Sequence, residues 1–342
     1  MEDDFETGAK KMKRFLAALL PLFCLTACAP KAQEYSTDFF AMNTFMQARV
    51  LGQDAQQTAT AVEQRVNALD KLLSRTREDS EIYRLNHANG AAIETEAAAY
   101  IALALPQIEA TSGSFDPTVA PLTDLWGIGT EAAHVPAQEE INQAMAHVGW
   151  ENIQVNGSQV TLKNGAEIDL GGIAKGAAAD ECAQILRDAG NEGLLALGGN
   201  IYAVGTNNGK PWVVGIADPD DTADYLATVA VQELSVVTSG DYERYFEQDG
   251  KRYHHIFNPA TGYPADSGLR GVTVIDQSSV RADAMTTALF VMGLEKGMAF
   301  CEQNEIAAVF ITSEKEIYTT SKVSEICEFS FVGEDKGYTY AS

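Results

Sequence analysis

The sequence predicts an α+β fold in which a mixed, largely antiparallel sheet core is flanked by helices. Three observations support this prediction. Residues 54–74 repeat apolar side chains at helical spacing, including Val62, Val66 and Leu69. The middle of the chain consists of short apolar runs separated by Gly-rich turns, which is typical of antiparallel strands. A second helical pattern and a short hairpin then close the chain.

The first third of the chain contributes mainly helices. Residues 38–50 read as a strand, residues 54–74 as an amphipathic helix packed on one face, and residues 74–86 as a polar loop. The Ala-rich residues 95–112 predict another helix, and one more is expected after Pro136, because proline suits the first turn of a helix.

The middle and last thirds contribute the strands. Two turn signals, Asn156-Gly157 and Asn164-Gly165, separate the runs ENIQV, QVTLK and AEIDL, and a helix is expected over about 175–189. Further strand candidates are LLALGGNIYAVG, WVVGIAD, ATVAVQE, LSVVTSG, RYHHIFN and GVTVI. The remaining elements are a helix at 282–292 and a hairpin formed by residues 308–312 and 316–320.

The composition is that of a globular, acidic protein. Apolar residues make up 46% of the 342 residues, and 48 acidic against 24 basic residues give a net charge of −24. This charge argues against binding a nucleic-acid backbone. An anionic ligand therefore requires local features, such as a lysine, a helix N-terminus or a metal ion.

The N-terminus has the layout of a lipoprotein signal peptide. A basic patch precedes the apolar run FLAALLPLFCLTAC, which is too short to span a bilayer. Its end, Leu25-Thr26-Ala27-Cys28, resembles the bacterial lipobox, which implies cleavage before Cys28 and lipid attachment to its sulfur. The alternatives are an ordinary helix, or a plain secretion signal with an incidental cysteine. The lipoprotein interpretation predicts a bacterial, membrane-anchored, extracytoplasmic protein, in the periplasm or at the cell surface.

This interpretation also sets the domain boundaries. We expect a signal peptide over 1–27, a tether over 28–37, one functional domain over 38–325 and a C-terminal tail over 326–342. The later cysteines lack metal-ligand spacing. Cys182 and Cys301 fall in helical segments as small apolar residues, and a Cys301–Cys327 disulfide is left open.

The stretch RADAMTTALFVMG, residues 281–293, places a carboxylate and hydroxyls in an apolar helix. Asp283 and Thr287 are four residues apart and share one helix face. Taken alone, this pattern favours a helix start, in which Asp or Thr caps free backbone N–H groups. The alternative is a hard-metal site that collects side-chain oxygens.

Four further stretches suit a ligand. In IDLGGIAKGAAAD, a strand is predicted to lead through a Gly-rich turn into a helix. The free N–H groups at the start of this helix, together with Lys175, could bind an anion. The alternative is a tight turn without a ligand. In SFDPTVAPLTDLWGIG, Trp126 is either an aromatic wall or a packing residue. LALGGNIYAVG and VVTSGDYERYF place glycines and hydroxyls at strand ends, although both also read as plain turns.

A fifth stretch, RYHHIFNPATG, contains two adjacent histidines. On a strand, His254 and His255 point to opposite faces, so one is expected in the core and one in a cleft. A histidine of near-neutral pKa is the usual general base, although one surface and one core histidine is an equally good interpretation. The absence of a third Cys or His at ligand spacing disfavours zinc.

Together these stretches resemble the ApbE-type FAD:protein FMN transferases, a family of bacterial flavin-transfer lipoproteins. The resemblance rests on AMNT, SFDPTVAPL with its WG, IDLGGIAKG, GGNIYAVG, TSGDYERYF, HHIFNPATG and ADAMTT, in the family's order. It implies a T-fold-like architecture and an enzyme that binds FAD and Mg²⁺. Such an enzyme transfers FMN to a threonine of an acceptor flavoprotein with a Ser/Asp-Gly-Ala-Thr motif and releases AMP.

The resemblance also implies roles for individual residues. Asp283, Thr287 and the backbone carbonyl of Ala174 are expected to bind Mg²⁺, and His255 to take the proton from the acceptor threonine. The positions expected around the flavin or adenine are Met42, Asp116, Thr118, Asp169, Lys175, Ser239, Gly240 and Ile256.

The chain departs from the family pattern at three places, which keeps other functions open. Asn43 replaces the usual glycine of Met-Gly-Thr, Ala177 replaces an aromatic, and the loop near Thr76 lacks a stacking side chain. The balance between transfer and hydrolysis is therefore open, and a Mg-dependent FAD pyrophosphatase giving FMN and AMP is one alternative. A non-catalytic flavin-binding lipoprotein is another, although storage requires neither a base nor a metal.

Overall fold

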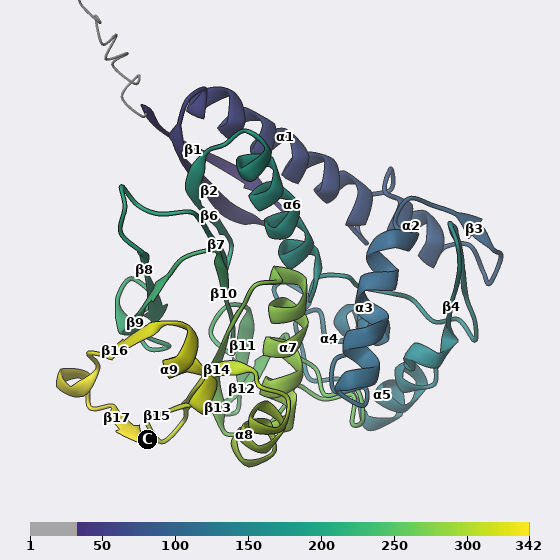
Figure 1. Ribbon diagram of the computed structural model, residues 1–342. Coiled ribbons are helices and arrows are strands. Elements are labelled where there is room, and N and C mark those ends of the chain that lie inside the picture. Colours follow the sequence, from purple (N-terminus) through teal and green to yellow (C-terminus); the bar gives the residue numbers. More distant parts are fainter. Residues whose placement is uncertain (1–32, 342) are drawn as a thin grey trace, which may run out of the picture. The chain divides into compact units, whose positions relative to one another are not determined.

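The computed structural model describes residues 33–341, and its centre is a nine-stranded sheet (Figure 1). The strand order is β1-β2-β6-β7-β10-β13-β14-β15-β17, and every pair is antiparallel except β15 with β17. The strands are β1 (Gln33–Ala41), β2 (Thr44–Gly52), β6 (Glu192–Leu197), β7 (Asn200–Val204), β10 (Leu234–Gly240), β13 (Leu269–Asp276), β14 (Ala307–Thr312), β15 (Glu316–Thr319) and β17 (Thr339–Ala341). The predicted α+β class with a mixed, largely antiparallel sheet is confirmed.

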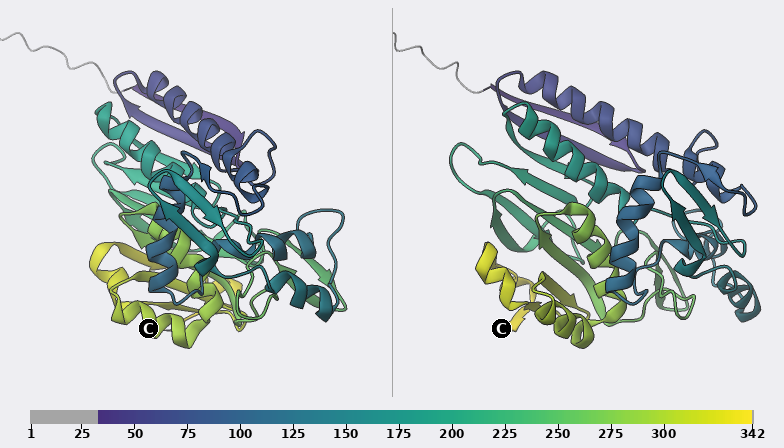
Figure 2. Two further views of the ribbon diagram at one scale, coloured as in Figure 1. Left: turned by 90° about the vertical axis from the view of Figure 1, so that its right-hand side faces the viewer. Right: turned by 45° about the vertical axis from the view of Figure 1, so that its right-hand side comes forward.

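Helices cover one face of this sheet. Figures 1 and 2 show α1 (Ala55–Leu73), α6 (Ala174–Asp188) and α7 (Ser279–Met292) side by side, with α8 (Leu294–Gln303) following α7. The apolar stripe of α1 predicted from the sequence is fully buried, with Val62, Val66 and Leu69 each 0% exposed. These side chains join α6 and the helix-facing residues of β2, β6 and β7 in the largest core cluster.

A second, three-stranded sheet covers part of the opposite face. It consists of β16 (Glu328–Phe331), β9 (Tyr225–Val231) and β8 (Trp212–Ala217), in that order. Trp212 and the apolar residues of β8 and β9 pack there against Val236 and Val309 of the main sheet. The main sheet is therefore buried on both faces over much of its width.

The N-terminal strand region differs from the prediction in two respects. Residues 38–50, predicted as one strand, form the hairpin β1–β2, which turns at Met42 and Asn43 with φ of 47° and 60°. Two consecutive positive φ values are the signature of a tight hairpin turn, and Asn tolerates them better than most residues. In addition, residues 33–37 of the predicted tether pair with β2 as part of β1. The predicted signal peptide, Cys28 and the rest of the tether lie outside the described residues.

An insertion of small elements follows α1. It comprises α2 (Glu81–Asn86), β3 (Ile93–Glu94), α3 (Ala98–Ala110), η1 (Pro117–Val119), α4 (Ala120–Trp126), α5 (Gln138–Met145), η2 (Trp150–Asn152), β4 (Ile153–Asn156) and β5 (Gln159–Leu162). The helix α2 falls in a segment predicted as loop, where Ser80 caps it by accepting bonds from Ile82 N–H and Tyr83 N–H. The run AEIDL, predicted as a strand, is irregular.

The C-terminal residues are part of the fold, so the predicted tail over 326–342 is wrong as a separate segment. After α9 (Ser321–Ile326), β16 pairs with β9. The 3₁₀ turn η3 (Glu334–Lys336) then leads into β17, which pairs with β15. The predicted hairpin of 308–312 with 316–320 is confirmed as β14 and β15.

Three further features of residues 33–341 concern a separate hairpin, the cysteines and the character of the helices. Strands β11 (Tyr245–Gln248) and β12 (Lys251–His254) form a separate hairpin beside the main sheet. Cys182, Cys301 and Cys327 are free thiols, so the disulfide left open by the sequence is not formed. In this part of the chain, no helix combines the length and the apolar character needed to cross a membrane.

Candidate active site

A pocket opens where β10 ends and α6 begins, enclosing about 990 Å³ including solvent at its mouth. Five segments far apart in the sequence line it, within residues 114–128, 169–175, 239–244, 255–259 and 283–287. They bring together eight of the residues predicted for the site, namely Asp116, Asp169, Lys175, Ser239, His255, Ile256, Asp283 and Thr287. The other predicted residues in the described part of the chain, Met42, Thr118, Ala174 and Gly240, do not line this pocket.

One wall of the pocket is the crossing of α6 and α7. A Cβ atom on Gly176 would lie 2.5 Å from the backbone oxygen of Ser279, so only glycine allows these helices to approach so closely. Each helix caps the other: Asp180 of α6 accepts hydrogen bonds from Ser279 N–H (2.7 Å) and Val280 N–H (3.1 Å) at the start of α7. In return, Gly176 N–H donates to Asp283 Oδ2 at 2.9 Å. This reciprocal capping holds Asp283 over the first turn of α6.

The helix-start explanation of Asp283 and Thr287 is therefore wrong for their own helix. The helix α7 begins at Ser279, and Ser278 is its N-cap, accepting from Arg281 N–H at 3.3 Å. Asp283 and Thr287 lie further along, where both face the pocket. Burial raises the pKa of Asp283, and Lys175 and Gly176 N–H oppose this shift.

Thr286, between these two pocket residues, has a structural role. It is fully buried, donates to the Asp283 carbonyl at 2.8 Å, and shares a 2.8 Å hydrogen bond with Ser239 Oγ. This bond ties α7 to the end of β10 and fixes the Ser239 side chain at the pocket wall.

The Gly-rich turn between β6 and β7 brings a cation to the pocket. Lys175 Nζ donates to the Gly198 carbonyl at 2.8 Å. Gly198 and Gly199 both have positive φ, and a Cβ on Gly199 would lie within 3.5 Å of Glu243 Oε1 and 3.8 Å of Lys175 Nζ. The sequence predicted that these glycines allow another group to come close to the backbone, and in the structure Lys175 and Glu243 are the groups that do so.

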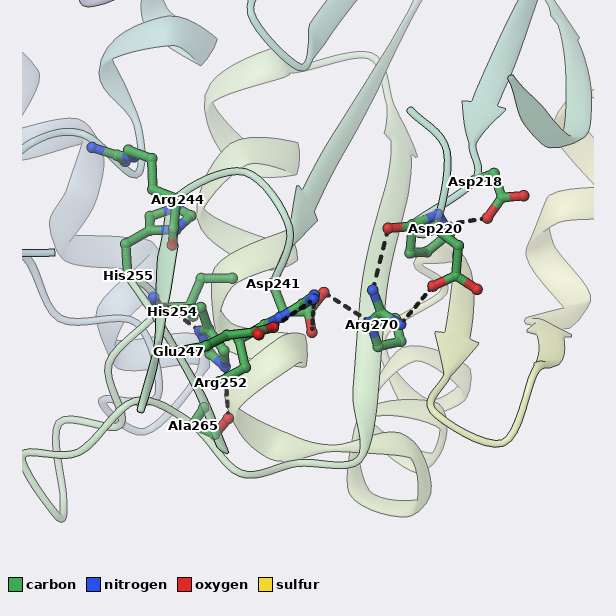
Figure 3. Close-up of polar contacts among 12 residues, drawn as sticks. Asp218, Asp220, Asp241, Arg244, Glu247, Arg252, His254, His255, Ala265 and Arg270 are labelled. Atoms are coloured by element: carbon green, nitrogen blue, oxygen red, sulfur yellow. Dashed lines mark hydrogen bonds and ion pairs between the residues drawn. The ribbon is translucent and has the colours of Figure 1, made fainter. Parts of the chain in front are cut away.

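His255 carries a free ring nitrogen at the pocket. Its Nδ1 lies 3.3 Å from the carbonyl of Arg244, and a carbonyl only accepts hydrogen bonds, so Nδ1 carries the proton and Nε2 is left basic (Figure 3). Burial, reinforced by Arg244 and His254, lowers the pKa of His255 well below its ordinary value. The ring is therefore neutral at pH 7, as a general base requires.

His254 is the core histidine of the pair. It is 6% exposed, its Nε2 lies 2.9 Å from the Ala265 carbonyl, and its Nδ1 accepts from Ile256 N–H at 3.3 Å. The predicted division into one core and one pocket histidine therefore describes the structure. These two bonds pin the segment that presents His255.

A network of charges supports the same segment from behind. Asp241 accepts hydrogen bonds from Arg270 Nε at 3.0 Å and Arg252 Nη1 at 3.4 Å, and Arg270 also bonds Asp220 at 3.0 Å (Figure 3). This network joins the end of β10 to β12 and β13, close to the end of β12 where the two histidines lie.

Asp116 and Thr118 shape the far wall. Asp116 accepts bonds from Thr118 N–H (2.8 Å), Thr118 Oγ1 (2.6 Å) and Trp150 N–H (3.0 Å), and Thr118 Oγ1 in turn accepts from Gly149 N–H (2.7 Å). Burial raises the pKa of Asp116. Both side chains therefore hold the turn at 116–118 to the backbone of Gly149 and Trp150, and of the two only Asp116 lines the pocket.

Asp169 combines a turn with an ion pair. Its Oδ1 accepts from Gly171 N–H at 2.8 Å, and its Oδ2 lies 3.0 Å from Arg75 Nε. The Nη2 atom of Arg75 lies 2.8 Å from Asp124 Oδ1. Arg75 lies in the polar loop in which the family usually has a stacking aromatic. Its neighbour Thr76 is exposed.

Two predicted features lie away from the ligand space. Met42 sits at the β1–β2 turn, where its N–H donates to Asp70 at 3.1 Å and Thr44 abuts Gly198. Trp126 is 0% exposed and donates to the Gly262 carbonyl at 3.0 Å, so the packing explanation of this tryptophan is correct.

Sequence reasoning missed three groups at the site. Glu243 and Arg244 line the pocket and belong to the stretch TSGDYERYF. The sequence signal that could have indicated them is an acidic residue next to a basic one, close to a glycine turn. Desolvation raises the pKa of the Glu243 carboxyl, and the positive charge of Lys175 opposes that shift. Asn200, in GGNIYAVG, is 0% exposed, and neither side-chain atom has a hydrogen-bond partner.

The assembled groups fit one class of chemistry. A buried carboxylate and a hydroxyl on one helix face offer oxygens to a hard cation. A lysine and a helix N-terminus attract an anion, and a neutral imidazole stands ready to accept a proton. These parts suit transfer of a phosphoryl-type group from an anionic substrate to a hydroxyl.

Comparisons with known proteins agree with this chemistry. The model of the ApbE family matches residues 42–310. A relative from Vibrio cholerae named FAD:protein FMN transferase is 34% identical over 314 residues, covering 88% of this chain and 94% of the relative. One of the same name from Treponema pallidum is 33% identical, covering 90% and 93%.

Solved structures give the same result. The crystal structure of an ApbE protein from Thermotoga maritima superposes with a TM-score of 0.82 at 35% identity, covering 86% of this chain and 99% of that one. The apo flavinyl transferase ApbE of Pseudomonas stutzeri gives a TM-score of 0.78 at 31% identity, covering 86% and 97%.

Proposed function

Because this chain belongs to the ApbE family and is an FAD:protein FMN transferase, we propose that it uses Mg²⁺ to move FMN from FAD onto a threonine hydroxyl of an acceptor flavoprotein, releasing AMP. The observation that carries the proposal is the pocket that places His255, Lys175 and the Asp283–Thr287 face around one space. The resemblance noted above assigns the acceptor a Ser/Asp-Gly-Ala-Thr motif.

The residues present fit a magnesium ion. In the described part of the chain, no three His, Cys, Asp or Glu side chains lie close enough together to hold a metal. Mg²⁺ does not require such a cluster, because it keeps water and phosphate ligands beside one or two carboxylates. Asp283 is 3% exposed and is in no ion pair among the described residues, as expected of a carboxylate that a cation completes.

Asp283, Thr287 and the Ala174 carbonyl would hold the ion in this proposal. Bound there, Mg²⁺ would neutralise charge on the FAD pyrophosphate and stabilise AMP as the leaving group. Lys175 adds a fixed positive charge on the same side, and the first turn of α6 presents N–H groups to the substrate.

His255 performs the proton transfer. The acceptor threonine oxygen attacks the phosphorus of the FMN half, a P–O bond to threonine forms, and the P–O bond to AMP breaks. His255 Nε2 takes the threonine proton, while the Nδ1–H bond to the Arg244 carbonyl keeps the ring in the reactive tautomer.

A flavin-transfer assay tests this function. The protein is incubated with FAD, an acceptor bearing the Ser/Asp-Gly-Ala-Thr motif, and either Mg²⁺ or EDTA. We expect covalent flavin fluorescence on the acceptor only with Mg²⁺, and none on an acceptor with that threonine changed to valine. FMN and AMP formed at the same rate without an acceptor, with no labelled acceptor, would instead identify a pyrophosphatase.

We also propose that the chain is a lipoprotein anchored at Cys28 to a bacterial membrane and facing the periplasm or the exterior. The lipobox Leu25-Thr26-Ala27-Cys28 after a basic patch and a short apolar run supports this. Cys28→Ser should move the protein from the membrane to the soluble fraction, whereas the matched change Cys24→Ser should not. Equal membrane recovery of both variants would contradict the anchor.

A further inference from the structure

Asn200 is a buried amide whose polar atoms are unused. It is 0% exposed, and its Oδ1 and Nδ2 are two of the five buried side-chain atoms without a hydrogen-bond partner in residues 33–341. An unpaired buried polar group destabilises the folded state, because it loses its hydrogen bonds to water and gains none in return. Such exceptions are rare in folded proteins, so this amide calls for a functional explanation.

The strand geometry directs Asn200 toward the helix layer. It begins β7 directly after the Gly198-Gly199 turn and pairs with Val237 of β10. Tyr202 and Val204, two and four residues on, belong to the core under the helices, whereas Ile201 packs against the opposite core. Because side chains alternate along a strand, Asn200 points to the helix side with Tyr202.

Asp283 occupies that side. The helices α6 and α7 both contact β7, and α7 also packs on β10. The Asn200 amide lies near enough to the Asp283 carboxylate to act on it as a donor, yet forms no hydrogen bond of normal length and angle. In the described residues, the Asp283 carboxylate therefore accepts a hydrogen bond from Gly176 N–H but none of normal geometry from Asn200.

We propose that Asn200 is a positioning residue for the cation site: its Nδ2–H group donates to the Asp283 carboxylate when that carboxylate engages a divalent cation. The inference rests on the proposed function, which places the cation at Asp283. Two donors from different elements, Gly176 N–H of α6 and the amide of β7, then fix the plane of the carboxylate. Groups that orient a metal ligand in this way typically contribute 10- to 100-fold to metal affinity.

A structural role predicts a different result. If the amide served only the fold, replacing it would remove stabilising bonds and lower the melting temperature. Because the amide has no such bond, Asn200→Leu should leave the melting temperature of the metal-free protein unchanged or higher. The same substitution should weaken cation binding about tenfold or more.

Mn²⁺ binding by electron paramagnetic resonance, alongside thermal unfolding, tests the inference on the full chain. Wild type is compared with Asn200→Leu, Asp283→Ala and the control Asn191→Leu; Asn200→Ala replaces the leucine variant if that does not fold. Asn191 is another buried amide, 4% exposed, but its Nδ2 donates to Thr58 Oγ1 at 2.7 Å. Its substitution should lower the melting temperature and leave Mn²⁺ affinity unchanged.

The outcomes separate this inference from the proposed function. Equal Mn²⁺ binding by wild type and Asp283→Ala would show that Asp283 does not bind the cation. This result would overturn both the proposed cation site and the role proposed for Asn200. If Asp283→Ala loses the ion but the Asn200 variant binds it as tightly as wild type, only the inference about Asn200 is overturned. A melting temperature that falls as far as that of Asn191→Leu would overturn it too, in favour of a structural amide.

Discussion

Gly176→Ala is the smallest change that should disturb the α6–α7 crossing on which the site depends. The added Cβ would lie 2.5 Å from the Ser279 oxygen and 2.8 Å from both the Ser279 carbonyl carbon and Val280 Cα. All three atoms are backbone, so no side chain can rotate away. Restoring an ordinary contact requires α6 and α7 to separate by about 0.9 Å.

The structure sets the size of the effect. Alanine is favoured over glycine in a helix by about 1 kcal/mol, whereas overpacking a core costs about 1–3 kcal/mol. We therefore expect a net loss of up to about 2 kcal/mol in the free energy of unfolding. The same separation stretches the 2.9 Å bond from Gly176 N–H to Asp283. A displacement near 1 Å at a reacting site lowers rates about 10²-fold.

Transfer rate and thermal unfolding are measured together on Gly176→Ala and on Gln184→Ala, an exposed position of the same helix. The control should match wild type in both measurements. The glycine variant should melt a few degrees lower and transfer flavin about 10²-fold more slowly. Wild-type rate and stability in Gly176→Ala would refute the argument that the two helices must touch there.

Three further changes probe the chemistry. His255→Gln should lower the transfer rate by about 10²–10⁴-fold in steady-state assays, since the proton acceptor is gone. The pKa of His255 is lowered in the folded protein, so the neutral imidazole predominates above pH 6.5. The wild-type transfer rate should therefore be constant above pH 6.5 and decline only well below that pH. A decline that begins near pH 7.5 would contradict the assignment of His255 as the base. Lys175→Met should raise the KM for FAD about 10- to 100-fold by removing a charged contact, with a smaller effect on kcat. Asp283→Ala should abolish turnover yet retain part of the flavin binding seen by fluorescence quenching; unchanged turnover would exclude its cation role.

Much of the site was predictable because its parts are local sequence patterns. Asp283 and Thr287 share a helix face by their spacing alone, and the alternation of a strand separates His254 from His255. What the spacing could not show is the partner of each group. Asp283 caps α6, more than a hundred residues earlier in the chain, rather than its own helix.

The misses at the two ends of the described chain have the same origin in long-range contacts, whereas the missed helix α2 depends on a local cap. Residues 33–37 looked like a tether because they are polar, but their backbone pairs with β2 at the sheet edge. The C-terminal residues looked like a tail, yet β16 and β17 add to two different sheets. Ser80 showed how a single cap starts a helix inside a polar loop. Backbone pairing and capping depend little on side-chain hydrophobicity, so periodicity did not reveal them.

The intact mass of an acceptor protein, co-expressed with this chain, tests the central claim most directly. With the wild-type chain, the acceptor should gain the mass of one FMN attached through a phosphoester, localised by peptide fragmentation to the threonine of its motif. With Asp283→Ala, the acceptor should keep its unmodified mass. An acceptor that stays unmodified with the wild-type chain, or gains FMN equally with both, would contradict the account.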